Sequence, residues 1–220
     1  MESLDGYASR LASEAPVPGG GSAAAVVGAL GAALVAMVAR ICGASPKYAA
    51  EAHVAGEVAA ESDSLRDRLT AARERDEHAF AAVVTAQRLP KASHEERAAR
   101  AEALEASLRA AAEAPLEAAE LVLRVLQLSE RVLQIPNRNL AGDAGCGAEF
   151  AYAALAACAY NVRVNHRYMH DERTIAAQSE LLERYEKEAA AILADVREVV
   201  NAALARPSTA LRSAQDDTGG

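Results

Sequence analysis

The chain has 220 residues, of which 51% are hydrophobic, and this length and composition fit one large domain or two small ones. Alanine and leucine dominate while aromatic residues make up only 4%, which excludes a sheet-rich protein and favours an all-α fold. The 31 acidic residues exceed the 23 basic ones, for a net charge of −8, so neither nucleic acid nor an anionic membrane is an expected partner.

The N-terminal segment predicts a short amphipathic helix over residues 2–14. It lacks the basic stretch and apolar core of a secretory signal. The three cysteines, Cys42, Cys146 and Cys158, form an odd set without the CxxC spacing of a zinc or disulfide framework. They are expected to be reduced, packed thiols, which favours a cytoplasmic protein.

A run of small and apolar residues follows the sequence PVPGGGS, and it suggests a phosphate loop, a membrane span or a buried helix. The phosphate-loop signature needs a lysine after its last glycine, but Ser22 is followed by alanines. Residues 23–39 are seventeen uncharged residues, fewer than the roughly 20 that a membrane span needs. We therefore expect a buried helix, with Pro16 and Pro18 ending the preceding helix and Ser22 capping the new one.

The glycine turn ahead of this helix is a candidate binding element. Gly19, Gly20 and Gly21 permit unusual backbone dihedrals, and the N–H groups at a helix start face outward toward an anion or a carbonyl. Small residues then recur on one side of the helix, at Ala24, Gly28, Gly31 and Ala32. This pattern is typical of the centre of a bundle or of a dimer interface, and tight packing alone also explains it.

The segment from Pro46 to Leu89 is predicted as one very long helix, with Pro46 suited to its first position. Its inward positions alternate spacings of three and four residues, which defines a heptad seam. The seam consists of Ala55, Val58, Ser62, Leu65, Leu69, Ala72, Asp76, Ala79, Val83 and Ala86.

Asp76 is the charged member of that seam. A carboxylate on an apolar seam is costly to bury unless it is paired, hydrogen-bonded or protonated. Two interpretations remain open: a functional carboxylate, or a structural one that pairs with a core arginine or meets water at an end of the bundle.

A second long helix is predicted from Ser93 to about Ile135. Pro90 ends the preceding helix, and Ser93 with Glu96 has the spacing of a capping box. The seam of this helix consists of Leu104, Leu108, Ala111, Pro115, Ala118, Val122, Val125, Ser129 and Val132. Pro115 removes one helical hydrogen bond, so we expect a kink or a break into two helices there, with a simple bend as the alternative.

The polar loop 136–145 separates this helix from the next one, for which Asp143 is a plausible N-cap and which extends to about residue 169. Asn161 and Asn165 lie one turn apart on this otherwise apolar helix. Their carboxamides suit the donors and acceptors of a heteroaromatic ligand, and hydrogen bonds between helices explain them equally well.

His166 and His170 are also four residues apart, a spacing compatible with a metal, but no glutamate-histidine signature surrounds them. We expect a solvated helix end rather than a metal site. A last helix is predicted over 173–205, with a seam at Ile175, Leu182, Tyr185, Ala189, Ile192, Val196 and Val199. Residues 206–220 are polar and are expected to be disordered.

Seams of this length are buried best in an antiparallel bundle, so residues 1–205 are predicted to form a single helical domain around the Gly/Ala-rich helix. Six motifs then occur in order: PVPGGGSAAA, SPKY, RDEHAFAAVVTAQRLP, APLEAAE, NRNLAGDAG and NVRVN. Together they resemble the formiminotransferase-cyclodeaminase family, namely its cyclodeaminase domain and the stand-alone methenyltetrahydrofolate cyclohydrolases, and the resemblance covers about residues 2–205.

The resemblance implies a homodimeric all-α enzyme that binds a tetrahydrofolate derivative in a cleft at the dimer interface. It implies that Asp76, in a matching D-x-x-A-F motif, is the catalytic carboxylate. Lys47 is a candidate for attracting the glutamate carboxylates of folate, and an ordinary exposed lysine is the alternative. The residues expected to bind the substrate are Gly19, Gly20, Gly21, Ser22, Lys47, Asn139, Asp143, Asn161 and Asn165.

Two reactions fit this resemblance. A cyclodeaminase converts 5-formiminotetrahydrofolate to 5,10-methenyltetrahydrofolate and ammonia, and a cyclohydrolase interconverts 5,10-methenyltetrahydrofolate and 10-formyltetrahydrofolate. Neither needs a metal or a redox cofactor, and the sequence does not decide between them. The chain is too short for an attached formiminotransferase domain, which favours a stand-alone cyclohydrolase. A non-catalytic helical assembly protein that uses the same seams is the alternative hypothesis.

Overall fold

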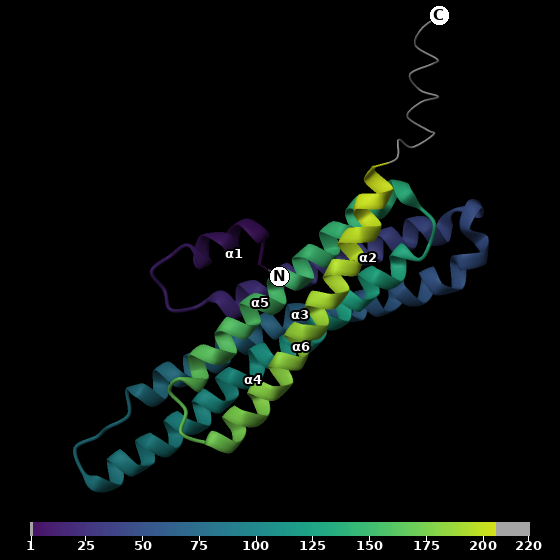
Figure 1. Ribbon diagram of the computed structural model, residues 1–220. Coiled ribbons are helices and arrows are strands. Elements are labelled where there is room, and N and C mark those ends of the chain that lie inside the picture. Colours follow the sequence, from purple (N-terminus) through teal and green to yellow (C-terminus); the bar gives the residue numbers. More distant parts are fainter. Residues whose placement is uncertain (1, 206–220) are drawn as a thin grey trace, which may run out of the picture.

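The computed structural model describes residues 2–205, and these residues form an all-α bundle (Figure 1). The predicted fold class is therefore confirmed, whereas the predicted disordered tail lies outside the described residues. The helices are α1 (Leu4–Leu11), α2 (Gly20–Ala44), α3 (Ala52–Gln87), α4 (His94–Leu133), α5 (Ala141–His166) and α6 (Glu172–Leu204), with short 3₁₀ turns η1 (Pro46–Glu51) and η2 (Arg138–Leu140).

The five long helices α2 to α6 lie side by side and are joined by short connections, so successive helices run in opposite directions (Figure 1). α2 packs against α3, α5 and α4, and α6 covers α4 and α5. One large apolar cluster fills the space between them. α1 lies to one side of the bundle and contributes a single buried side chain, Tyr7.

α2 is packed so closely that its small residues are required. Ala24, Gly28, Gly31 and Ala32 are all buried. A methyl group at Gly31 would lie 2.9 Å from the carbonyl oxygen of Gly147 on α5, which is closer than a real Cβ contact allows. By length and composition α2 is apolar enough to cross a membrane, but most of that stretch is covered by its neighbours, which favours the buried-helix interpretation.

The ends of the long helices follow the sequence signals closely. Ser93 accepts a hydrogen bond from the backbone N–H of Glu96, and the Glu96 carboxylate accepts one from the backbone N–H of Ser93, so the predicted capping box is confirmed. The first turn after Pro46 is 3₁₀ rather than α-helical. α6 begins one residue earlier than predicted because Asp171 caps it.

α4 continues through Pro115 as one helix of 40 residues, so the predicted break into two helices is wrong. A proline in a helix leaves the carbonyl four residues earlier without its N–H partner. Here that carbonyl belongs to Ala111, and it accepts a hydrogen bond from the Asn165 side chain of α5 at 2.9 Å. A side chain from another helix thus replaces the bond that Pro115 removes.

Candidate active site

The candidate site lies where α2 begins. α2 starts at Gly20, opposite Asp76 on α3, while the α3–α4 hairpin continues beyond this point (Figure 1). The main core lies on one side, and a smaller apolar cluster that includes Val83, Leu108 and Met169 lies on the other. The cavity between them has a volume of about 200 Å³ and is lined by Pro16, Val17, Gly19, Gly20, Asp76, Phe80, Ala111, Asn161, Val164 and Asn165.

Asp76 faces the first turn of α2. A methyl group at Gly21 would lie closer than 3.0 Å to all three atoms of the Asp76 carboxyl group, so the glycine is what admits the carboxylate. Burial raises the pKa of Asp76 to about 6, against the opposing effect of a hydrogen bond from the Ser22 backbone. The carboxyl group therefore titrates close to neutral pH.

The predicted pairing of Asp76 with a core arginine is not found among residues 2–205. Arg73 pairs with Glu2 and Glu74, and Arg75 pairs with Glu117. Asp76 is also not at an end of the bundle, because α3 continues for eleven residues to Gln87. The start of α2 favours a negative charge at this position through its free N–H groups and its helix dipole.

Ser22 does not cap α2, so that prediction is wrong. Gly19, in an extended conformation, occupies the cap position, and Ser22 lies in the first turn, where it is fully buried. Its hydroxyl is 2.8 Å from the Tyr7 hydroxyl and donates a hydrogen bond to the Glu77 carboxylate at 3.0 Å. The Ser22 side chain therefore holds the turn from the side of α1 and Glu77, while Gly21 faces Asp76 and Gly20 faces Asn161.

Asn161 and Asn165 both line the cavity. Their amide nitrogens are used within the protein: Asn161 donates to the carbonyl of Ala157, and Asn165 donates to the carbonyls of Asn161 and Ala111. These bonds leave the two carboxamide oxygens as acceptors. Structural and ligand-binding interpretations of the pair are thus compatible, because each side chain has a separate atom for each role.

The other predicted binding residues lie at the opposite end of α2, roughly 37 Å away along its 25 residues. Lys47 is in η1, with its amine 5.3 Å from the centre of the Tyr48 ring. Asn139 is exposed in η2. Asp143 lies in the first turn of α5 and does not cap it, because Leu140 occupies the cap position. Within one chain these residues do not meet Asp76.

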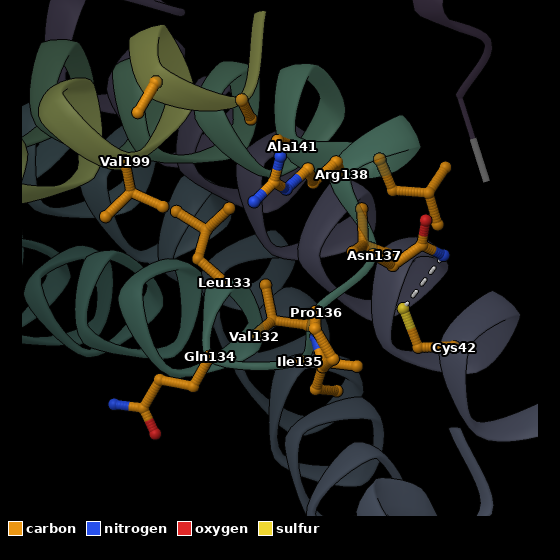
Figure 2. Close-up of a pocket in the computed structure, with 14 residues that line it drawn as sticks. Cys42, Val132, Leu133, Gln134, Ile135, Pro136, Asn137, Arg138, Ala141 and Val199 are labelled. Atoms are coloured by element: carbon orange, nitrogen blue, oxygen red, sulfur yellow. Dashed lines mark hydrogen bonds between the residues drawn. The ribbon is translucent and has the colours of Figure 1, made fainter. Parts of the chain in front are cut away.

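A second cavity, which we did not predict from the sequence, lies at that opposite end (Figure 2). It has a volume of about 400 Å³ and is mostly aliphatic. The amide of Asn137 donates a hydrogen bond to the sulfur of Cys42 across 3.5 Å, and Arg138 lies at the cavity wall. The walls come from the ends of α2 and α4, the start of α5 and the last turns of α6.

The histidines form hydrogen bonds within the protein. His166 shares one with Gln178 at 2.7 Å, and His170 lies 3.2 Å from the Glu105 carboxylate. Residues 2–205 contain no group of three His, Cys, Asp or Glu side chains that is arranged to hold a metal ion.

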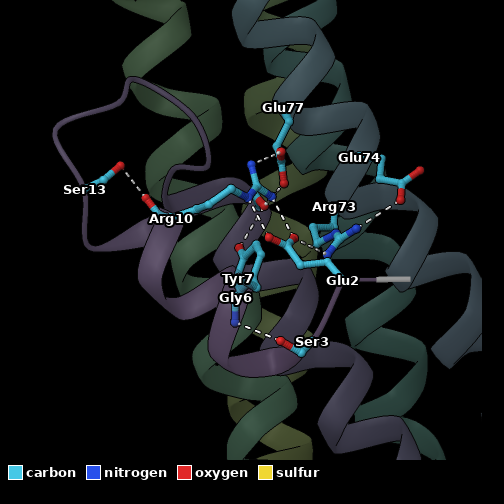
Figure 3. Close-up of polar contacts among 10 residues, drawn as sticks. Glu2, Ser3, Gly6, Tyr7, Arg10, Ser13, Arg73, Glu74 and Glu77 are labelled. Atoms are coloured by element: carbon cyan, nitrogen blue, oxygen red, sulfur yellow. Dashed lines mark hydrogen bonds and ion pairs between the residues drawn. The ribbon is translucent and has the colours of Figure 1, made fainter.

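Several contributors to the site were missed in the sequence, among them the cavity-lining Pro16, Val17 and Ala111. Phe80 and Val164 line the cavity, and helical spacing from Asp76 and Asn161 would have identified both. Tyr7 and Glu77 were missed because their roles depend on contacts between α1, α2 and α3 (Figure 3).

Comparison with known proteins gives a consistent result. The family model for formiminotransferase-cyclodeaminase matches residues 3–184. The chain is 37% identical to the methenyltetrahydrofolate cyclohydrolase of Methylorubrum extorquens, over 90% of this chain and 96% of that protein. It is 31% identical over 87% of its length to the mouse formimidoyltransferase-cyclodeaminase, but spans only 36% of that protein. The crystal structure of formiminotetrahydrofolate cyclodeaminase from Thermotoga maritima superimposes with a TM-score of 0.83 at 25% identity, over 92% of this chain and 98% of that one.

Proposed function

The chain belongs to the formiminotransferase-cyclodeaminase family, and we propose that within it the protein is a cyclohydrolase, which adds water to 5,10-methenyltetrahydrofolate to give 10-formyltetrahydrofolate. An enzyme function of the folate cyclohydrolase or cyclodeaminase type follows from the family and from the relatives. The finer choice rests on the relative that matches almost end to end, which is a cyclohydrolase.

The observation that carries this proposal is the Asp76 carboxyl group, which lies in a largely apolar cavity and has no ion-pair partner within residues 2–205. Because burial raises its pKa to about 6, the group accepts and returns a proton near neutral pH. As a carboxylate it also stabilises the cationic amidinium of the methenyl substrate. A structural carboxylate would instead be paired or solvated, as the other acidic side chains near it are.

The reaction balances with water and protons alone. The oxygen of water bonds to the methenyl carbon while Asp76 takes one proton, which gives a neutral carbinolamine. The bond between this carbon and nitrogen 5 then breaks, Asp76 returns its proton to nitrogen 5, and the carbinol hydroxyl becomes the formyl carbonyl as its proton passes to solvent. We therefore propose that no metal or redox cofactor takes part.

The remaining groups of the cavity fit this sequence of steps. Gly20 lines the cavity at the first turn of α2, where backbone N–H groups have no partner within the helix and suit the developing carbonyl oxygen. The carboxamide oxygens of Asn161 and Asn165 accept hydrogen bonds from N–H groups such as those of the pterin ring. Phe80 and Val164 form an apolar wall against which a flat ring packs.

A volume of about 200 Å³ is smaller than the roughly 300–1,000 Å³ of most ligand pockets, so one chain encloses only part of a folate. We propose a homodimer that completes the cleft. α2 exposes Leu30, Met37 and Ile41 on one side, and α5 exposes Phe150 and Tyr160. Phe150 lies against α2 at Gly31, so these side chains belong to one face. Such a face is typical of a protein interface.

Pairing across this face with the two α5 helices antiparallel has a consequence for the site. The η2 end of one subunit would then lie near the Asp76 cavity of its partner. That arrangement would reunite Lys47, Asn139 and Asp143 with the residues that face Asp76, although they are separated within one chain. Lys47 is then available for the glutamate carboxylates of folate.

Cyclodeaminase activity is the second candidate, because the superimposed structure from Thermotoga maritima is a formiminotetrahydrofolate cyclodeaminase. The two activities share one chromophore, so a side-by-side assay separates them. Near-ultraviolet absorbance of methenyltetrahydrofolate should decay faster with the protein than in the blank. The same absorbance should not appear from 5-formiminotetrahydrofolate. Asp76→Asn should abolish the decay, and full activity in that variant would refute the role of the carboxylate.

Two further proposals concern the cell. All three cysteines are free thiols, including the exposed Cys146, and this supports a reducing, cytoplasmic location. The net charge of −8 supports the absence of a nucleic-acid partner.

A further inference from the structure

α1 contacts the first turn of α2 through Tyr7 and contacts α3 beside the candidate site through Arg10 (Figure 3). The Tyr7 side chain is 5% exposed, and its ring lies near the guanidinium groups of Arg10 and Arg73, at 5.9 and 5.4 Å. Its hydroxyl is 2.8 Å from that of Ser22. Because Ser22 gives its only hydroxyl proton to the carboxylate of Glu77, Tyr7 is the donor in the bond to Ser22.

Two consecutive carboxylates of α3 therefore hold the same turn of α2. The Asp76 carboxyl group faces the backbone of this turn at Gly21, and Glu77 accepts a hydrogen bond from the side chain of Ser22. Glu77 is held in turn by Arg10 at 3.3 Å, and both carboxylate oxygens of Glu2 bind Arg10, at 2.8 and 3.0 Å. A series of contacts therefore leads from α1 through Glu77 and Ser22 to the turn of α2 that faces Asp76.

We propose that Tyr7, Ser22 and Glu77 form a positioning network that holds the backbone N–H of the first α2 turn on the Asp76 carboxylate. None of the three lines the cavity, so their effect on the reaction passes through Asp76. The kinetic test of this network rests on the function proposed above. The protonation of Asp76 provides a second test that needs no substrate, because it also depends on the position of this N–H.

The network acts on Asp76 in two opposite ways. The Ser22 backbone bond favours the ionised carboxylate, whereas the negative charge of Glu77 disfavours it. Cys158 of α5 also faces Asp76, and its pKa is raised to about 12 by burial and by Asp76. Arg10 of α1 and Arg73 of α3 lie around the Tyr7 ring rather than at Asp76 itself. α2 faces the carboxyl group with backbone, and α4 contributes Ala111.

Two single-atom changes in the network should therefore shift the protonation of Asp76 in opposite directions. Tyr7→Phe removes the donor behind Ser22 and loosens the turn, so the midpoint of the acidic limb of kcat moves to higher pH. A displacement of half a unit lowers kcat about threefold at pH 5 and little at pH 8. Glu77→Gln keeps an oxygen acceptor for Ser22 but removes the charge, so the same midpoint moves to lower pH.

The matched control is Tyr185→Phe, which removes a hydroxyl from α6 at a distance from the cavity and should leave the midpoint unchanged. A ¹³C NMR titration of the aspartate carboxyl groups follows Asp76 without any substrate. If neither Tyr7→Phe nor Glu77→Gln moves the Asp76 titration, or both move it in one direction, the positioning network is refuted. If the titration moves as expected but no folate substrate reacts, the proposed function fails and the network stands.

Discussion

The hydrogen bond from Asn165 to the Ala111 carbonyl predicts an energetic coupling between Asn165 and Pro115, two residues on different helices. Ala111 is 5% exposed, so loss of the Asn165 donor leaves a buried carbonyl oxygen without a partner. That loss costs about 1–3 kcal/mol of unfolding free energy. In a Pro115→Ala background the restored backbone N–H of residue 115 takes over this carbonyl, so Asn165→Ala should cost at least about 1 kcal/mol less there.

The double-mutant cycle is measured by urea unfolding, with helix content followed by circular dichroism at one protein concentration, because an oligomer changes the apparent stability. Asn165 also donates to the Asn161 carbonyl, but that loss is common to both backgrounds and cancels in the cycle. Asn161→Ala provides the control, since its amide bonds to Ala157 within α5 and should not couple to Pro115. If Asn165→Ala lowers the free energy of unfolding equally in both backgrounds, the Asn165 amide does not replace the missing N–H of residue 115, and the reasoning is refuted.

The remaining predictions concern the site, its charge and the interface. Gly21→Ala should lower kcat more than tenfold, because the added methyl group meets the Asp76 carboxyl group. Gly56→Ala is the control, because its methyl group meets nothing within 4 Å. This control should retain activity and gain about 0.5–1 kcal/mol of stability, measured by thermal unfolding. The pKa of Asp76 is raised in the folded state, so between pH 4 and 6 the folded protein binds more protons than the unfolded protein. The free energy of unfolding of the wild type should therefore rise, relative to that of Asp76→Asn, as the pH falls through this window. A wild-type advantage that grows as pH rises would contradict this sign. Ile41→Glu on the exposed face of α2 should convert a dimer to a monomer in sedimentation, whereas Leu204→Glu on α6 should not, and a monomeric wild type would refute the proposed interface.

The fold was largely predictable because its signals are local and repeated. Seam positions such as Leu69 and Val122 are fully buried, and the capping box at Ser93 starts α4 where the sequence placed it. Asp76 was identifiable for the related reason that one charge on an apolar seam contradicts the pattern around it. These inferences need only the period of a helix.

The errors arose where a distant partner changes a local rule. Pro115 should interrupt a helix, but the compensating donor is Asn165, which is 50 residues further along the chain. Serine is a typical N-cap residue, but the hydroxyl of Ser22 forms hydrogen bonds with Tyr7 and Glu77 instead. Helical periodicity identifies the face on which a residue lies and not its height relative to other helices, so the separation of Asn139 from Asp76 was not anticipated.

The cavity beside Asp76 exists because α2 is shorter than the hairpin against which it packs. The space lies where one or two further turns of α2 would continue the helix, and Pro16 and Val17 of the preceding segment form part of its wall. Its depth is therefore set by the residue at which α2 begins, and a change in the length of the preceding segment, residues 12–19, would deepen or close the cavity without altering the core. In such a bundle, the pocket and the fold can vary independently.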